Sequence, residues 1–262
     1  MSSPLVRYTV DGAAARLTLD SPHNRNALSS ALVAQLRDGL RRAEADPAVR
    51  AVVLGHTGNT FCAGADLTEP SVSSAGGPYE AAAARAVELA ATLRAIVECR
   101  FPVIAAVDGH VRAGGLGLVG ACDIAVAGPR CTFALTEARI GVAPAIISLT
   151  LLPKLAPRAA ARYFVTGETF TADRAAEIGL VTVAVDDVSG AVNDLVAELG
   201  KASPQGLAAS KALTTAGVLA GFDRDAQRLA EESARLFVSD EAHEGMLAFL
   251  EKRAPRWAEP TI

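Results

Sequence analysis

The segment 101–123 constrains the fold more than any other part of the chain. It opens with β-branched and small apolar residues, which predict a buried strand over 102–107. After Asp108-Gly109 the chain enters a glycine cluster of Gly114, Gly115, Gly117 and Gly120. An apolar segment that predicts a helix comes next. Glycines between a strand and a helix let backbone N–H groups approach a ligand closely, because no Cβ stands in the way. Such groups can hold a phosphate, or a carbonyl oxygen that becomes anionic during a reaction.

Strands and helices alternate along most of the chain. Alternating apolar and polar residues around Asp11-Gly12 predict a β-hairpin over 5–19. Further strands are predicted over 49–54, 124–127, 132–134 and 181–185, and helices over 29–45, 79–98, 145–156, 157–165 and 171–178. From about residue 189 only helices are predicted, over 189–201, 204–220, 223–238 and 240–252. Residues 68–78 are rich in serine, glycine and proline, which predicts a mobile loop.

The composition excludes several classes of protein. Half of the 262 residues are hydrophobic, so a sizeable core can form. A net charge of −4 without a basic run argues against nucleic-acid binding. The sequence shows neither a secretory signal nor an apolar run long enough to span a membrane. The four cysteines and the histidines show no metal-ligand spacing, so we expect buried, reduced thiols in a cytoplasmic protein, and no metal site.

Residues 115–120 match the pattern GxGxxG of dinucleotide-binding proteins. That fingerprint requires the glycines to follow the strand directly, whereas seven residues separate Val107 from Gly115. A nicotinamide-dependent oxidoreductase is therefore the weaker alternative, and glycines that serve only close packing are another. A second small-residue loop, FCAGAD at 61–66, also follows a predicted strand. Two such loops could each supply one N–H group to a single thioester oxygen.

Several motifs resemble the successive signatures of the enoyl-CoA hydratase/isomerase (crotonase) family. They are SPHNRNAL, FCAGADL, RFPVIAAVDGHVRAGGLGLVGACDIAVA, FALTEARIGVAPA and HEGMLAFLEKR, in the order and spacing of the family. The resemblance implies an α/β fold, a spiral of ββα repeats over 1–188, followed by a helical trimerisation region over 189–262. It also implies a homotrimer or a dimer of trimers that binds an acyl-CoA substrate and needs no separate cofactor. The glycine segment is also similar to bacterial methylglutaconyl-CoA-type hydratases.

The resemblance implies that the N–H groups of Ala65 and Gly114 bind the thioester oxygen, and that Glu137 is the acid/base. Apolar neighbours would raise the pKa of Glu137 and suit it to proton transfer, whereas a salt bridge to Arg139 would make it an ordinary surface residue. Family hydratases commonly use two glutamates, and the first position falls on Gly117. Hydration of the C2–C3 double bond is ranked slightly above isomerisation, and a non-catalytic acyl-CoA-binding protein is the third hypothesis.

Further candidates concern the substrate. His110 and Arg112 could replace the missing carboxylate or bind an acidic acyl group, or they are surface loop residues. The resemblance implies substrate contacts at Arg25, Ala27, Ala63, Asp66, Leu67, Gly117, Phe249 and Lys252. Asp66 is expected to order its loop rather than to react. Phe249 is expected mainly to pack, because it shares one helix face with other apolar residues.

Overall fold

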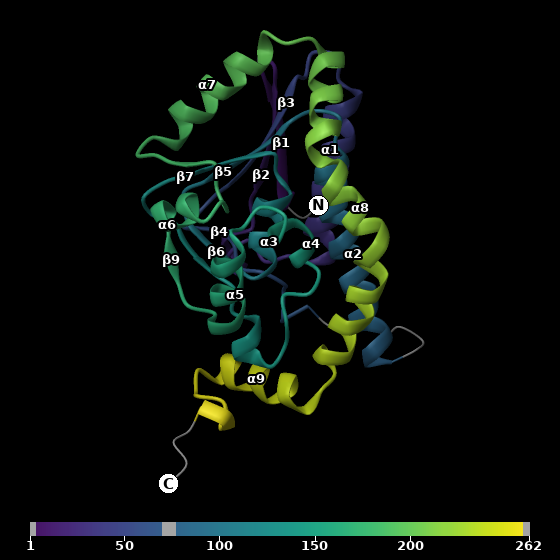
Figure 1. Cartoon of the computed structure of the whole chain (residues 1–262), viewed down its shortest axis with the longest axis vertical. Coiled ribbons are helices and arrows are strands. Elements are labelled where there is room, and N and C mark those ends of the chain that lie inside the picture. The colour runs from purple at the N-terminus through teal and green to yellow at the C-terminus, as the bar shows by residue number, and fades with distance from the viewer. Residues whose placement is uncertain (1–3, 70–76, 259–262) are drawn as a thin grey trace.

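The computed structural model describes residues 4–69 and 77–258, so most of the loop predicted over 68–78 lies outside it. Two sheets form the centre of the molecule (Figure 1). The larger sheet has the order β1 (Val6–Asp11), β2 (Ala14–Leu19), β3 (Ala51–His56), β5 (Val103–Val107), β7 (Ile124–Ala127) and β10 (Val183–Ala184). The smaller sheet has the order β4 (Thr60–Cys62), β6 (His110–Arg112), β8 (Thr132–Ala134) and β9 (Phe170–Thr171).

Helices surround the two sheets. They are α1 (Ser30–Ala45), α2 (Pro78–Glu98), α3 (Gly114–Ala121), α4 (Ser148–Leu151), α5 (Pro157–Thr166), α6 (Ala172–Glu177), α7 (Val188–Gly200), α8 (Pro204–Phe237) and α9 (Asp240–Glu251), with 3-10 turns η1 (Pro22–Asn24), η2 (Glu137–Ile140) and η3 (Arg256–Ala258). The helix α7 packs on β3, β5 and β7, whereas α8 runs along α2 (Figure 1). The division of the chain at residue 188 stays a prediction.

Consecutive strands are shared between the two sheets. The strands β3, β5 and β7 pair in parallel in the larger sheet, and β4, β6 and β8, which follow them along the chain, pair in parallel in the smaller one. A helix follows in two of these turns, α2 after β4 and α3 after β6. The repeat is therefore a ββα spiral, and the predicted fold class is confirmed.

Serine caps fix where three of the helices begin, and apolar spacing fixes the buried face of α1. The side chains of Ser29, Ser203 and Ser239 accept hydrogen bonds from the backbone N–H groups of Leu32, Gly206 and Ala242 and so cap α1, α8 and α9. In α1 the residues Leu32, Leu36 and Leu40 recur at helical spacing and are buried. The local sequence thus supports both the starting points and the buried faces of these helices.

Several elements differ from the prediction. The helices predicted over 204–220 and 223–238 form the single 34-residue helix α8. Gly221 costs only about 1 kcal/mol in a helix interior, and the buried Phe222 packs in the main core. The helix predicted over 145–156 is limited to α4, because Pro153 has no backbone N–H with which to continue the hydrogen bonding of the helix. The strands β4, β6 and β9 were not predicted, and β4 and β6 lie where loops were expected.

The cysteines follow the prediction: all four are buried and unpaired. No helix within the described residues is both long and apolar enough to cross a membrane.

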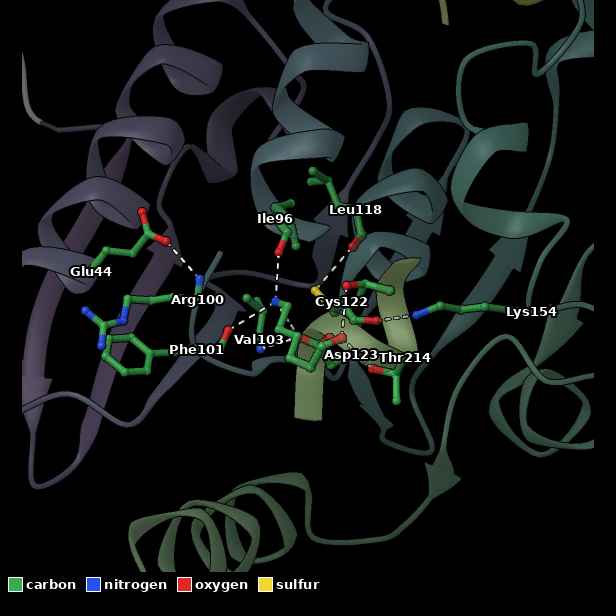
Figure 2. Close-up of polar contacts among 12 residues, drawn as sticks. Glu44, Ile96, Arg100, Phe101, Val103, Leu118, Cys122, Asp123, Lys154 and Thr214 are labelled. Carbon is green, nitrogen blue, oxygen red and sulfur yellow. Dashed lines mark hydrogen bonds and ion pairs between the residues drawn. The ribbon is translucent and has the colours of Figure 1, made fainter. Parts of the chain in front are cut away.

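A buried ion pair joins Lys211 of α8 to Asp123, which lies between α3 and β7. Lys211 Nζ lies 2.7 Å from Asp123 Oδ2, and the two side chains are only 4% and 14% exposed. Lys211 also donates to the carbonyl oxygens of Ile96 and Phe101, and Asp123 accepts the N–H of Val103; these four partners are labelled in Figure 2. The ion pair therefore fastens α8 to the end of α2 and to the start of β5.

We expect Lys211→Met to lower the free energy of unfolding by about 3–5 kcal/mol, because the variant leaves the Asp123 carboxylate buried without its partner. Urea unfolding measures this loss. The control is Lys201→Met, which breaks an exposed ion pair with Glu198 and should cost less than about 1 kcal/mol. Equal losses in the two variants would show that the buried ion pair stabilises the fold no more than the exposed one.

Candidate active site

Three loops leave the same edge of the smaller sheet. The strands β4, β6 and β8 are parallel neighbours, with Val111 of β6 opposite Phe133 of β8. They continue into residues 63–66, 113–114 and 135–137, respectively. Since neighbouring strands lie about 4.8 Å apart, the loops at their carboxyl ends lie side by side, which is where parallel sheets commonly bind ligands. The sheet thus brings the predicted oxyanion loops to the loop that carries Glu137.

The backbone N–H groups of Ala65 and Gly114 lie close together. A Cβ atom placed on Gly64, which has a positive φ of +91°, would be 3.5 Å from the nitrogen of Gly114. A Cβ atom placed on Gly114 would be 3.9 Å from the nitrogen of Ala65. Within the described residues neither amide donates a hydrogen bond to the protein. Both are therefore available to one ligand oxygen.

The peptide group between Gly64 and Ala65 is held from its other side. Its carbonyl oxygen accepts the N–H of Leu28 at 2.8 Å. In a planar trans peptide the C=O and N–H bonds point in opposite directions, so this bond directs the Ala65 N–H away from Leu28. It also polarises the peptide group and strengthens the Ala65 amide as a donor.

Gly114 supplies the first amide of α3. The preceding residue, Ala113, has a positive φ of 47°, which costs about 1–3 kcal/mol for a residue with a Cβ. This conformation is held by two bonds: Ala113 donates to Ala134 O at 3.1 Å and accepts the N–H of Leu116 at 2.9 Å. The first amides of a helix have no partner within it, and the helix dipole favours negative charge beside them. The Gly114 amide is therefore suited to an oxyanion.

Glu137 opens η2 and is 9% exposed. Its Oε2 atom is buried without a hydrogen-bond partner in the described part of the chain. Burial raises the pKa of Glu137 from 4.5 to about 7. The Arg139 guanidinium donates to the Thr166 carbonyl oxygen instead of pairing with this carboxyl. A salt-bridged surface glutamate is thus excluded, and a carboxyl that can both give and take a proton at neutral pH is present.

The turn that carries Glu137 is covered by α9 of the same chain. A Cβ on Gly245 would lie 2.5 Å from the backbone of Ile140, and one on Gly141 would lie 2.7 Å from the backbone of Glu241. The two glycines thus permit direct backbone packing. Sequence reasoning missed this contact; the only signals were these two glycines in segments far apart along the chain.

Gly117, the position of the missing glutamate, is tightly packed. A Cβ there would lie 2.5 Å from Ile147 Cγ2 and 3.2 Å from Leu93 Cδ1. Gly115 and Gly120 are also packed closely, against β4 and α4 respectively. Close packing, one of the alternatives for the cluster, therefore explains these three glycines. The strand β6 occupies the gap before them, so they do not follow β5 as a dinucleotide fingerprint requires.

His110 and Arg112 lie on a strand and not on a surface loop. His110 Nδ1 and Arg112 Nη2 both lie 2.8 Å from Thr132 Oγ1, and Arg112 Nη1 donates to Thr132 O at 2.6 Å. Burial lowers the pKa of Arg112. Both side chains therefore join β6 to β8 through Thr132, and a role for either in place of the missing carboxylate stays a prediction.

Two predicted substrate residues frame the Ala65 loop. The Arg25 side chain is exposed, and its carbonyl oxygen accepts the N–H of Ala63 at 3.1 Å. The Asp66 carboxylate accepts bonds from Thr68 and Asn24. Burial opposes its ionisation, but these hydrogen bonds prevail and lower the pKa of Asp66. Asp66 thus orders the loop.

The other predicted contacts differ in exposure. Ala27 is buried and Leu67 half-buried. Phe249, near the end of α9, is 56% exposed in the single chain, so its expected packing stays a prediction. Lys252, just after α9, is exposed and has a positive φ of 57°. In the described ranges no group of three or more histidine, cysteine or acidic side chains could hold a metal ion.

The chain is similar to known proteins over nearly its whole length. The enoyl-CoA hydratase/isomerase family matches residues 9–260. A crystal structure of an enoyl-CoA hydratase from Mycobacterium avium is 69% identical, with a TM-score of 0.91, over 98% of this chain and 100% of that one. A probable enoyl-CoA hydratase of Mycobacterium tuberculosis is 34% identical over 86% of this chain and 88% of its own length. A peroxisomal dienoyl-CoA isomerase of Arabidopsis thaliana is 26% identical over 97% and 96%. The chain belongs to the enoyl-CoA hydratase/isomerase family.

Proposed function

We propose that the protein hydrates the C2–C3 double bond of an enoyl-CoA thioester, with Glu137 as the acid/base. One observation carries the proposal: three adjacent strand ends bring two unoccupied amides and the loop with a buried, unpaired carboxyl to one edge of a sheet. The names of the relatives, including a crystallised enoyl-CoA hydratase at 69% identity, support this reaction class.

The proposed reaction needs a stabilised enolate and one proton carrier. The thioester oxygen accepts the N–H groups of Ala65 and Gly114, each of which contributes about 3–4 kcal/mol as negative charge develops. The Glu137 carboxylate takes a proton from water as the water oxygen bonds to C3. It then returns the proton to C2, which restores the thioester carbonyl. A pKa of about 7 suits Glu137 to both steps.

The coenzyme A part of the substrate needs cationic partners for its phosphates. The exposed Arg25 and Lys252 side chains are the proposed partners. Ala27, Ala63 and Leu67 line the path to the amides in this proposal. Exposed apolar side chains on and after α9, among them Leu250 and Trp257, suit a subunit contact, so a homotrimer or a dimer of trimers is expected.

Isomerisation of a 3-enoyl thioester is the second candidate function, and the packing of Gly117 favours it. Ile147 fills the space that a Cβ at residue 117 needs, so this position supplies no second carboxylate. Isomerisation needs only one base, because Glu137 can remove a proton from C2 and return it to C4. The same two amides would stabilise the dienolate.

We expect Glu137→Gln to lower kcat for crotonyl-CoA or a 3-enoyl-CoA by about 10²–10⁴-fold, because the amide cannot carry the proton. Loss or gain of the conjugated thioester absorbance separates hydration from isomerisation. Glu177→Gln, at an exposed residue paired with Arg174, is the control. Binding of both thioesters by the wild type without turnover would favour a non-catalytic acyl-CoA-binding protein.

We expect Gly117→Glu to destabilise the protein by about 1–3 kcal/mol or more, because the new side chain overlaps Ile147. Adding Ile147→Ala makes room for the carboxyl and should raise the rate of hydration relative to isomerisation. Urea unfolding and the two absorbance assays measure these effects, with Ile147→Ala alone as the control. An unchanged unfolding free energy in Gly117→Glu would show that the position is open.

The pKa of Glu137 also links stability to pH. Folded Glu137 keeps its proton up to about pH 7, whereas an unfolded glutamate loses it near 4.5, so its contribution is complete below pH 4.5 and falls as the pH rises to 7. We expect the unfolding free energy of Glu137→Gln, relative to wild type, to rise by on the order of 3 kcal/mol across this range. Urea unfolding of both proteins at several pH values tests this prediction. A difference in unfolding free energy that stays constant with pH would mean that the pKa of Glu137 is ordinary.

A further inference from the structure

Asn26 is a completely buried polar residue that the proposed chemistry does not use. It is 0% exposed and has a left-handed backbone conformation with a φ of 53°. Arg25 before it is also left-handed, with a φ of 59°. Asparagine adopts this conformation more readily than most residues, but arginine does so at a cost of about 1–2 kcal/mol. Other interactions must therefore hold this turn.

The Asn26 side chain makes three hydrogen bonds that cross between two loops. Its Oδ1 atom accepts the N–H of Ser21 at 2.7 Å. Its Nδ2 atom donates to the carbonyl oxygens of Thr57 and Thr60, at 3.1 and 2.8 Å. The carboxamide thus braces the turn before α1 against the connection between β3 and β4.

The braced turn holds the Ala65 loop through three backbone bonds. Arg25 O accepts the N–H of Ala63 at 3.1 Å, and Leu28 O accepts the N–H of Asp66 at 3.3 Å. Between them, the Leu28 N–H binds Gly64 O at 2.8 Å and so orients the peptide group that ends in the Ala65 N–H. Asn26 lies between the two residues that make these bonds.

We propose that Asn26 is a positioning residue, which aims the Ala65 amide at the thioester oxygen through Leu28. This inference rests on the proposed oxyanion role of Ala65. Loss of the carboxamide frees the turn, and the peptide group between Gly64 and Ala65 can then rotate. A small displacement of an oxyanion donor reduces its stabilisation of the enolate much more than its contact with the ground state.

The test uses Asn26→Gly, which keeps the left-handed backbone accessible and removes only the side chain. Asn26→Asp fills nearly the same volume and keeps the acceptor for Ser21, so it serves if the glycine variant folds poorly. The matched control is Thr215→Ala, which also removes a buried side-chain hydrogen bond, that of the Thr215 hydroxyl to Lys211 O on α8. The probe is dimethylaminocinnamoyl-CoA, whose absorption moves to longer wavelength when donors polarise its thioester oxygen.

We expect both Asn26 variants, saturated with the probe, to show a smaller absorption shift than wild type and a kcat lower by about tenfold or more. The control should keep the wild-type shift. Folded Asn26 variants that retain the full shift and kcat would overturn the inference, even if they are less stable. A wild-type protein that binds the probe without any shift would instead refute the oxyanion role of Ala65, which keeps the two failures distinct.

Discussion

Parallel pairing among three very short strands determines the chemistry available to this protein. The strands β4, β6 and β8 contain three residues each, yet their register places two peptide groups and the loop of one carboxyl at a common edge. None of these groups is unusual by itself. Their importance in the proposed reaction comes from convergence, because that reaction needs both amides at the enolate oxygen and a proton carrier at the neighbouring carbon.

The helix α3 serves both the site and the core. Its first residue presents an amide, whereas the other glycines let the helix press against β4 and the side chains of Ile147 and Leu151. Every residue of α3 is buried. Tight packing on all sides gives the Gly114 amide a fixed position, and the same packing leaves no space for a second carboxyl at Gly117. The packing that fixes the Gly114 amide is therefore the same packing that excludes a glutamate at position 117.

Much of the larger sheet could be predicted from sequence because its strands are long and apolar. The hairpin, the strand after α1 and the strand at 103–107 fall where periodicity placed them. Of the smaller sheet only the strand at 132–134 was predicted, since two- and three-residue strands carry little pattern and form mainly through their neighbours. The continuity of α8 escaped prediction for a similar reason: packing against α2 outweighs a weak glycine signal.

In the candidate site, too, local features could be predicted from the sequence, whereas contacts between distant segments could not. Small residues after strands indicated the two loops, and the family resemblance implied the amides of Ala65 and Gly114. The apolar surroundings of Glu137 correctly predicted its raised pKa. The role of Thr132 in holding His110 and Arg112 depends on pairing between strands twenty residues apart, which local sequence does not reveal. The exposure of Phe249 likewise depends on how α9 is docked.

The docking of α9 on η2 has a consequence for the acidity of Glu137. Residues 240–251 follow Glu137 by about a hundred residues along the chain, yet they cover the turn that carries it. Before α9 docks, that turn is open to solvent, and a hydrated carboxyl does not keep a raised pKa. The raised pKa of Glu137 therefore depends on a contact between two distant segments of the chain.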